Sequence, residues 1–557
     1  MKPGIEDTLS HDHLSAGKSA VASWDYVKKI FTVPEGEHST LARLETEISN
    51  NIDGYLRQQL VAGDLIPEEI ERLFRETSIP ENPCFVAEQT HFLLEHVVRQ
   101  SVHVSSPSFI GHMTSAMPYF MLPLAKIMFA LNQNLVKIET SKAFTPLERQ
   151  VLGMLHRLIF ARDQSFYDKT TQNANMCLGI FGSGGTTANI AALWVARNRL
   201  LAARNGLPGI RDCGVAAALQ AHGLSNLAIL VSERGHYSLT KAADLLGLGR
   251  QQCIAIPVDD SNRVRLPDLK AKIAQLKEEK VGIVAIIGIA GTTETGSVDP
   301  LNDMADLCAE ERIHFHVDAA WGGPTLFSKT HSLKLRGIER ADSVTFDAHK
   351  QLYIPVGAGM VLFRDPESAS VIENHAHYII RKGSRDLGRF SLEGSRPGMA
   401  MLVHSALRII GKKGFAMLIE NGLAMAQSFA AMIHQHEDFE VIAEPELNLL
   451  CYRFCPLSWR RHFANLAQEA QAKFNQSINA LTIRIQKSQR AAGKSFVSRT
   501  TIYGADYGRL PIVVFRSVMA NPLTGENHLR SVLNEQSQIA RNSPEYTLVE
   551  ELVSLPV

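Results

Sequence analysis

The sequence has few cysteines, no excess of charge and no long apolar run, and each absence excludes a class of protein. Seven cysteines are scattered over 557 residues, and the nearest two, Cys451 and Cys455, lack CxxC spacing. Lys plus Arg and Asp plus Glu both total 57, so net charge gives no reason for binding nucleic acid or a membrane surface. No apolar run approaches the roughly 18 residues of a membrane span.

The first residues, Met1 to Ser23, mix acids, histidines and lysine and contain no apolar core of a signal peptide. Together these observations predict a cytoplasmic protein with reduced thiols and no metal site. Neither a nucleic acid nor a membrane is expected as a partner.

The hydrophobic pattern divides the chain into three parts. Residues 1–105 begin with a polar stretch to about 38 and continue with helical spacing, which indicates an N-terminal arm and helical segment. In residues 106–390 strand-like runs alternate with helical patterns, which favours a large α/β domain whose mostly parallel sheet is flanked by helices. Residues 391–557 predict a smaller α+β domain.

Strands are expected in the large domain at 227–231, 253–257, 283–289, 313–317, 343–346 and 360–363, and helices at 188–204, 266–277 and 301–311. The small domain is expected to contain a long helical stretch at 397–435, strands at 449–454 and 511–515, and a final helix at 525–538.

A lysine follows one of these strands directly, in the tetrad Asp347-Ala348-His349-Lys350. Asp318 ends the preceding strand-like run, in His316-Val317-Asp318-Ala319-Ala320. A lysine can form an imine with the aldehyde of pyridoxal phosphate (PLP), and an aspartate can keep the pyridine nitrogen protonated. The pair therefore indicates a PLP site at the carboxyl edge of the sheet.

A glycine-rich loop, Gly182 to Asn189, stands between a strand-like run and a helix. Backbone N–H groups of such a loop and the helix N-terminus favour a phosphate, and Gly185 and Thr186 lie at its centre. The loop is not a Walker A motif, because no Gly-Lys-Ser/Thr follows. Taken alone, it is equally well explained as a flexible turn.

Three further residues have both a functional and a structural interpretation. His236 follows a strand and could stack on the cofactor ring, although a loop histidine is more often structural. Thr292, in a Thr- and Gly-rich turn, could bind the ring hydroxyl or the substrate. Arg516 follows an apolar strand and suits a substrate carboxylate, or else an internal salt bridge.

These motifs occur in an order that resembles group II PLP-dependent amino-acid decarboxylases, from about Pro107 to the end of the last helix. The resemblance implies a fold type I homodimer with composite active sites and an amino acid as its small-molecule substrate. It implies that Lys350 is the Schiff-base lysine, that Asp318 partners the pyridinium, and that His236 and Ala320 pack on opposite sides of the ring. Other positions that it implies are Gly185, Thr186 and His349 at the phosphate, Thr292 at the cofactor, Ser395 as a phosphate contact from the neighbouring subunit, and Arg516 at the substrate α-carboxylate.

The resemblance also bears on the substrate. Glutamate decarboxylases bind the side-chain carboxylate with a glutamine and a serine, where this chain has His112 and Thr114. Both can donate hydrogen bonds, and a protonated histidine would add charge. The whole chain is similar to bacterial aspartate 1-decarboxylases, which make β-alanine and CO2. Glutamate and cysteine sulfinate remain alternative substrates, and an aminotransferase, another PLP lyase and a non-catalytic scaffold remain alternative functions.

Two positions depart from the family pattern. The mobile loop that should supply a tyrosine is short, and Tyr378 is its only tyrosine; either Tyr378 or His236 would protonate the substrate carbon. Relatives often carry serine or asparagine where this chain has Asp347. Because an acid would repel a phosphate, we expect Asp347 to face elsewhere or to accept a backbone hydrogen bond.

Overall fold

The structure is a computed structural model that describes residues 40–57, 60–62, 65–204, 206–376, 380–381, 383–504 and 507–554. The chain forms two compact units, one of residues up to Ser106 together with Arg490–Ser495, the other of Pro107–Gln489 and Phe496–Val557. The first unit is helical, with α2 (Thr40–Leu56), α3 (Pro67–Leu73) and α4 (Val86–Leu93). Helix α3 begins at a proline and carries Glu68 and Glu69 in its first turn, both favourable at a helix N-terminus.

The second unit contains a seven-stranded sheet in the order β1-β7-β6-β5-β4-β2-β3. Neighbouring strands from β6 to β3 pair in parallel, and β7 alone runs antiparallel to its neighbours. The mostly parallel sheet expected from the sequence is thus confirmed. The strands are β1 (Gly179–Gly182), β2 (Asn226–Ser232), β3 (Cys253–Ile256), β4 (Val281–Ile289), β5 (Phe315–Asp318), β6 (Ser343–Asp347) and β7 (Gly359–Phe363).

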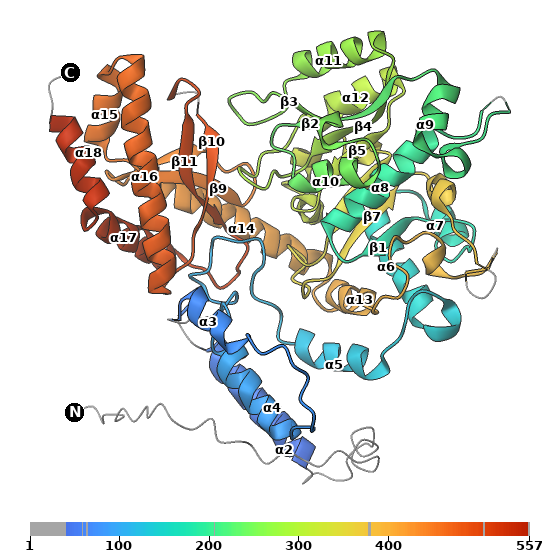
Figure 1. Ribbon diagram of the computed structural model, residues 1–557, viewed down its shortest axis with the longest axis horizontal. Helices are drawn as coiled ribbons and strands as arrows, with labels where there is room; N and C mark the ends of the chain where they lie inside the picture. The colour runs from blue at the N-terminus through green and yellow to red at the C-terminus, as the bar shows by residue number, and fades with distance from the viewer. Residues whose placement is uncertain are drawn as a thin grey trace. The chain divides into compact units, whose positions relative to one another are not determined.

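Both faces of this sheet are buried, which explains why its strands are continuous apolar runs. Along β2, Leu227 and Ile229 belong to a core cluster shared with the helices α8, α9 and α10, whereas Ala228 and Leu230 belong to the cluster shared with α11 and α12. Alternate side chains therefore point to opposite faces, each covered by helices (Figure 1). The flanking helices are α6 (Phe144–Phe160), α7 (Gln164–Thr170), α8 (Gly185–Leu200), α9 (Ile210–His222), α10 (Tyr237–Leu245), α11 (Leu266–Glu278) and α12 (Leu301–Glu311), and α5 (Met121–Leu131) precedes them.

A second, antiparallel sheet has the order β10-β11-β9-β8 and lies in the orange-to-red part of the chain (Figure 1). Its strands are β8 (Phe439–Ala443), β9 (Leu449–Phe454), β10 (Ser498–Tyr503) and β11 (Pro511–Val518). Its helices are α15 (Leu457–Asn465), α16 (Gln468–Ala492), α17 (Glu526–Arg541) and α18 (Pro544–Ser554). This α+β part agrees with the fold class expected for the C-terminal region.

The long helical stretch expected at 397–435 is two helices, α13 (Ala400–Ile409) and α14 (Gly411–His434). Gly411 has a φ of +68°, a conformation that few other residues adopt, and it breaks the helix there. By length and composition α14 could cross a membrane. It packs against β8, β9 and α17, and buries Phe415, Phe429 and Ile433, as a core helix does.

Candidate active site

A cavity of about 360 Å³ opens at the carboxyl edge of the large sheet. Asp318 is the last residue of β5 and Asp347 the last of β6, and both line it. The glycine-rich loop before α8 forms another wall. Parallel strands bring residues far apart in the sequence to one edge, which is where open α/β sheets bind ligands. The remaining lining residues include Asn189, Arg234, His236, Gly291, Thr293, Ala320, Trp321, His349 and Lys350.

Lys350 lies in this cavity beside the Asp347 carboxylate. Its Nζ is 3.3 Å from Asp347 Oδ2, and His349 Nε2 is 3.6 Å from the same oxygen. His349 Nδ1 donates to the carbonyl of Ala358, at 3.0 Å, and so ties the tetrad to the loop before β7. Because a carbonyl only accepts, Nδ1 of this ring carries a proton, and Nε2 faces the carboxylate.

The expectation that Asp347 faces away from the cavity, or accepts a backbone hydrogen bond, is wrong. Its side chain is 2% exposed, and Oδ1 is buried with no hydrogen-bond partner. A Cβ on Gly359 would come within 2.4 Å of Oδ1, and one on Gly185 within 2.9 Å of Oδ2. Strand β6 sends this side chain toward the glycine-rich loop, and two glycines leave room for it there.

The glycine-rich loop is built as an anion cradle. Thr187 Oγ1 donates to the carbonyl of Gly184, at 2.8 Å, and lies 3.3 Å from the Gly184 nitrogen, so the loop is held against the first turn of α8. The first N–H groups of a helix have no partner within it and attract anions. Gly184, Gly185 and Thr186 all line the cavity. A Cβ on Gly184 would come within 3.1 Å of His349, so glycine keeps this wall open.

A chain of buried hydrogen bonds lies behind Asp318. Asn189 Nδ2 donates to Asp318 Oδ2, at 2.9 Å, while Asn189 Oδ1 lies 3.1 Å from His316 Nε2. His316 Nδ1 is 2.8 Å from Ser343 Oγ, which is itself 2.9 Å from His314 Nε2. The chain thus joins α8, β5 and β6 beneath the cavity floor.

These bonds have one consistent direction. Burial lowers the pKa of His314 and of His316 to about 4, so both rings are neutral near pH 7. Since Asn189 Nδ2 donates to a carboxylate, its Oδ1 must accept from His316 Nε2–H. His316 Nδ1 then accepts from the Ser343 hydroxyl, which accepts from His314. Every donor points toward Asp318, an arrangement that stabilises its negative charge.

His236 lies at the cavity wall as the N-cap of α10. Its Nδ1 accepts from the Ser238 backbone N–H, at 3.3 Å, which leaves the proton of a neutral ring on Nε2. Burial, assisted by the positive charge of Lys350 and opposed by Asp318, lowers the pKa of His236. Ala320 is buried and lines the same cavity. The structure therefore brings His236, Ala320, Asp318 and Lys350 together.

Thr292 does not reach this cavity. Its hydroxyl accepts from the backbone N–H of Ser297, at 3.1 Å, and lies 2.8 Å from Thr295 Oγ1, so its own turn uses it. Thr293, the next residue, lines the cavity instead. Neighbouring residues of a turn point in different directions, and the spacing of the sequence does not decide which one faces a ligand.

Arg516 is in β11, and its guanidinium donates hydrogen bonds to backbone carbonyls of two other segments. Nε donates to the carbonyl of Thr293, and Nη1 donates to the carbonyl of Gly111, at 3.3 Å. The residue is 7% exposed, and Nη2 is buried without a partner. The internal salt bridge considered for this residue is absent from the ion pairs of the described residues, and an unpaired buried guanidinium nitrogen suits an anionic ligand.

His112 and Thr114 form a pair near Arg516. His112 Nδ1 is 2.8 Å from Thr114 Oγ1 and accepts from the Thr114 N–H, at 3.2 Å. Burial, Arg516 and Lys350 all lower the pKa of His112. The added charge expected from a protonated His112 is therefore not supported, and the neutral ring keeps Nε2–H as a donor.

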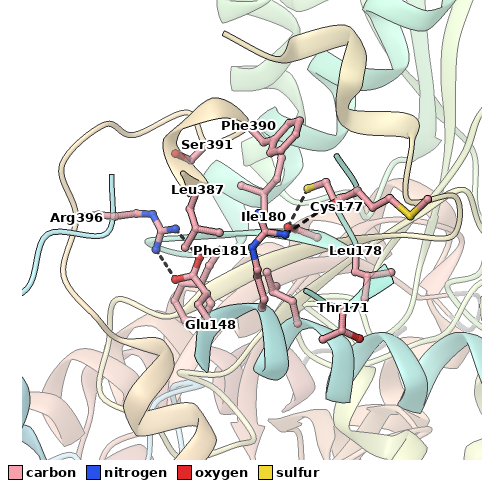
Figure 2. A pocket seen from close by; sticks show the side chains of 14 residues that line it. Glu148, Thr171, Cys177, Leu178, Ile180, Phe181, Leu387, Phe390, Ser391 and Arg396 are labelled. Atoms are coloured by element: carbon pink, nitrogen blue, oxygen red, sulfur yellow. Dashed lines mark hydrogen bonds and ion pairs between the residues drawn. The ribbon is translucent and has the colours of Figure 1, made fainter. Parts of the chain in front are cut away.

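Ser395, like Thr292, His112, Thr114 and Arg516, is not on the cavity wall. It accepts from Asn134 Nδ2, at 2.9 Å. Its neighbour Arg396 forms a buried two-bond ion pair with Glu148 of α6, which Figure 2 shows beside a smaller cavity. This pair anchors the turn that carries Ser395. Tyr378 falls outside the described residues.

Two further residues of the cavity wall, Arg234 and Asn189, were not expected from the sequence. Arg234, two residues after β2, is 6% exposed and lines the cavity. Its Nη1 pairs with Glu294, at 3.1 Å, while Nε and Nη2 have no hydrogen-bond partner. Arg234 stands two residues before His236, and Asn189 closes the glycine-rich loop. Proximity to these motifs was the signal that could have identified them.

The residues present fit PLP. A lysine, an aspartate with donors behind it, a histidine and an anion cradle converge on one cavity. Two carboxylates next to the cradle, Asp347 and Glu393, oppose a phosphate, and Glu393 accepts from the Ser183 N–H, at 3.2 Å. Among the described residues no group of three or more His, Cys, Asp or Glu side chains could hold a metal ion.

Comparison with known proteins agrees with this geometry. The chain is 55% identical to an aspartate 1-decarboxylase of Aliivibrio fischeri over 526 residues, 94% of this chain and 96% of the relative. It is 26% identical to the acidic amino acid decarboxylase GADL1 of Mus musculus, over 81% of this chain and 76% of that protein.

The fold of mouse CSAD in its apo form matches with a TM-score of 0.77 at 24% identity, over 90% of this chain and 99% of that one. A glutamate decarboxylase domain from Vibrio parahaemolyticus matches with a TM-score of 0.76 at 20% identity, over 94% of this chain and 100% of that one. The pyridoxal-dependent decarboxylase conserved domain matches residues 68–455. The chain therefore belongs to the pyridoxal-dependent decarboxylase family and is a PLP-dependent amino-acid decarboxylase.

Proposed function

We propose that this enzyme removes the α-carboxyl group of L-aspartate and produces β-alanine and CO2. The observation that carries the proposal is the buried guanidinium of Arg516, whose Nη2 has no partner within the protein. An amino acid's carboxylate supplies the missing acceptor. The 55% identity to an aspartate 1-decarboxylase supports the choice of aspartate.

PLP, when bound, supplies the electron sink that accepts the pair released with CO2. Lys350 would hold the cofactor covalently, and Asp318 would keep its pyridine nitrogen protonated. Arg516 orients the α-carboxylate, so that binding energy is directed at the bond to be broken. Ala320 and the His236 ring would pack against the cofactor ring, and Gly185, Thr186 and His349 would hold its phosphate.

A proton must replace CO2 on the substrate carbon. His236 carries its proton on Nε2, because Nδ1 accepts from Ser238. His236 can therefore deliver that proton, and Tyr378 is the other candidate. Substitution of each by phenylalanine separates them, since the donor's loss lowers kcat more than KM.

The acidic side chain of the substrate is proposed to lie near His112 and Thr114. The Nε2–H of a neutral His112 is a donor for a carboxylate oxygen. Arg234, which lines the cavity, is another buried guanidinium with unpartnered nitrogens. Two cations and an imidazole donor favour a substrate with two acidic groups over an aromatic one.

We further propose that the enzyme is a cytoplasmic homodimer. Leu122, Ile127 and Phe129 of α5 are 48%, 48% and 73% exposed, which is unusual for one short helix of a monomer. A second copy covering such a face would also bring its own Ser395 to this chain's phosphate cradle, which Ser395 does not reach in its own chain. All seven cysteines are free thiols, as in a reducing compartment.

The test is release of CO2 from aspartate, glutamate, cysteine sulfinate and tyrosine by one preparation assayed in parallel. We expect the highest kcat/KM with aspartate. A pocket distinguishes one methylene by about 1–3 kcal/mol, so preference over glutamate should be roughly 5- to 150-fold. Higher efficiency with glutamate or cysteine sulfinate would replace aspartate as the substrate; amino transfer without CO2 would refute decarboxylation.

A further inference from the structure

The turn at 290–298 connects β4 with Asp299 and is closed by its own backbone. The Ser297 carbonyl accepts from the N–H groups of Gly291 and Thr292, at 3.1 and 2.9 Å. These bonds tie the two arms of the turn to each other, so a shift at its base is transmitted to its tip.

Two consecutive residues at the tip of this turn bind the buried arginines of the site. The carbonyl of Thr293 accepts from Nε of Arg516. The carboxylate of Glu294 pairs with Nη1 of Arg234, at 3.1 Å. In Arg516, Nε and Nη2 lie on one edge of a planar guanidinium, and Nη2 is the nitrogen without a partner. The Thr293 carbonyl therefore helps to set the direction in which Nη2 donates.

Asp299 anchors the base of the turn within the large sheet. It is 3% exposed, and its Oδ1 and Oδ2 accept from the N–H groups of Val264 and Ile289, at 2.8 and 2.9 Å. One carboxylate thus joins the end of β4 to the segment that follows β3. Burial raises the pKa of Asp299 to about 7; the two N–H donors lower it, and the neighbouring acids Asp259 and Glu446 raise it.

Glu446 anchors the same base from the small sheet. It lies in the connection between β8 and β9, and its Oε2 accepts from the Val298 N–H, at 2.9 Å. Its Oε1 accepts from Nη2 of Arg263, at 2.8 Å. Two acids from different parts of the chain therefore hold the adjacent positions 298 and 299, where the turn ends.

We propose that Asp299 and Glu446 are positioning residues for the substrate α-carboxylate. Through the turn they hold the Thr293 carbonyl, and through that carbonyl they orient the Arg516 guanidinium. The inference rests on the proposed role of Arg516. Neither acid is among the residues that line the cavity, so both act through the turn. A small displacement is enough, since misplacing an orienting group by about 1 Å can cost about 100-fold in rate.

The test compares Asp299→Asn and Glu446→Ala with the wild type at about pH 8.5, where Asp299 is ionised. Asparagine keeps the shape, but its amide nitrogen faces an N–H that needs an acceptor. We expect kcat/KM for the amino acid that the enzyme decarboxylates best to fall about tenfold in each variant. The amine product lacks the α-carboxylate, so its inhibition constant should not change. The dissociation constant of PLP should not change either.

Asp342→Asn is the matched control. Oδ2 of Asp342 accepts from the Phe315 N–H, at 2.9 Å, and Oδ1 pairs with Arg364. These contacts lie at the amino ends of β5 and β6, at the opposite edge of the sheet from the cavity. Asp342→Asn should therefore lower the free energy of unfolding and leave kcat/KM unchanged.

Arg516→Ala, measured beside these variants, separates the inference from the proposal on which it rests. If Arg516→Ala loses kcat/KM selectively and a folded variant of Asp299 or Glu446 does not, the inference is overturned while the role of Arg516 stands. If Arg516→Ala shows no selective loss, both are overturned. Equal weakening of substrate, product and PLP binding in the Asp299 and Glu446 variants would show a merely structural role and also overturn the inference. Should Asp299→Asn not fold, the half-buried Glu446 decides alone.

Discussion

At the residue scale, the Arg516 side chain links the two sheets of the second unit. It leaves β11 of the small sheet, donates to the Thr293 carbonyl beyond β4 of the large sheet, and keeps Nη2 free. Arginine suits this position because its planar fork can donate to protein carbonyls and to a ligand carboxylate at once.

Arg516→Ala is expected to lower kcat/KM for aspartate by about 2–5 kcal/mol, since a carboxylate would then be buried without its partner. Steady-state rates of CO2 release measure this. Arg499→Ala is the matched control, because Arg499 is exposed on the neighbouring strand β10, opposite Phe515. Equal losses in the two variants would mean that Arg516 only supports the small sheet.

At the scale of elements, the hydrogen-bond chain through α8, β5 and β6 stabilises the negative charge of the Asp318 carboxylate. Asn189→Leu keeps the volume but deprives Asp318, His316 and Thr345 of their shared partner. Losing such a buried donor costs about 1–3 kcal/mol, so PLP should dissociate roughly tenfold more readily.

The control for Asn189→Leu lies on the same helix. Asn198 is equally buried in α8 but donates to the Val371 carbonyl, away from the cavity. Asn198→Leu should reduce the free energy of unfolding without changing PLP affinity. If both variants bind PLP like the wild type, the chain does not support Asp318.

A second prediction concerns α6 and the turn that carries Ser395. Glu148→Gln leaves Arg396 as an unpaired buried charge, which should lower the free energy of unfolding by about 3–5 kcal/mol. Urea unfolding measures the loss. Glu139→Gln, which breaks an exposed pair with Lys137, should leave stability unchanged. A similar result for both would mean that the Arg396 pair contributes no more than a surface pair.

Strands with a clear apolar pattern were predicted from the sequence, and a strand without such a pattern was missed. Strands β2 and β4, buried on both faces, are continuous apolar runs and were found. Strand β10 is polar, alternates between half-buried and exposed residues, and was missed. Lys350, Asp318 and the glycine-rich loop were recognised from motifs, whereas Thr293 and Arg234 depend on side-chain direction in the folded chain.

The orientation of Asp347 was beyond a sequence argument for the same reason. Electrostatics with the phosphate alone predicts that the carboxyl turns away. Lys350 and the two glycines at 185 and 359 reverse that preference in the folded protein.

At the scale of the whole molecule, buried neutral histidines make the fold sensitive to acid. Burial lowers the pKa of His156 from 6.5 to about 4; its Nε2–H donates to Phe363 O at 3.0 Å and its Nδ1 accepts from Tyr167 at 2.9 Å. A folded-state pKa below the unfolded one means that its contribution is complete above pH 6.5 and is lost as the pH falls toward 4.

The wild type should therefore lose about 2 kcal/mol of unfolding free energy through His156 between pH 7 and pH 5. His156→Gln cannot titrate, and should be less stable than the wild type at pH 7 but lose less on acidification. Urea unfolding of both proteins at the two pH values gives the comparison. Parallel losses would show that other groups cause the acid sensitivity.

The central claim is that Lys350 binds PLP in the cavity formed by Asp318, His236 and the glycine-rich loop. Borohydride reduction of the PLP-loaded enzyme, followed by digestion and peptide mass spectrometry, tests it most directly, because reduction fixes the cofactor to the lysine that holds it. The account predicts a pyridoxyl-phosphate adduct on the peptide containing Lys350, and neither adduct nor CO2 release in Lys350→Ala. An adduct on another lysine, or normal turnover by Lys350→Ala, would contradict it.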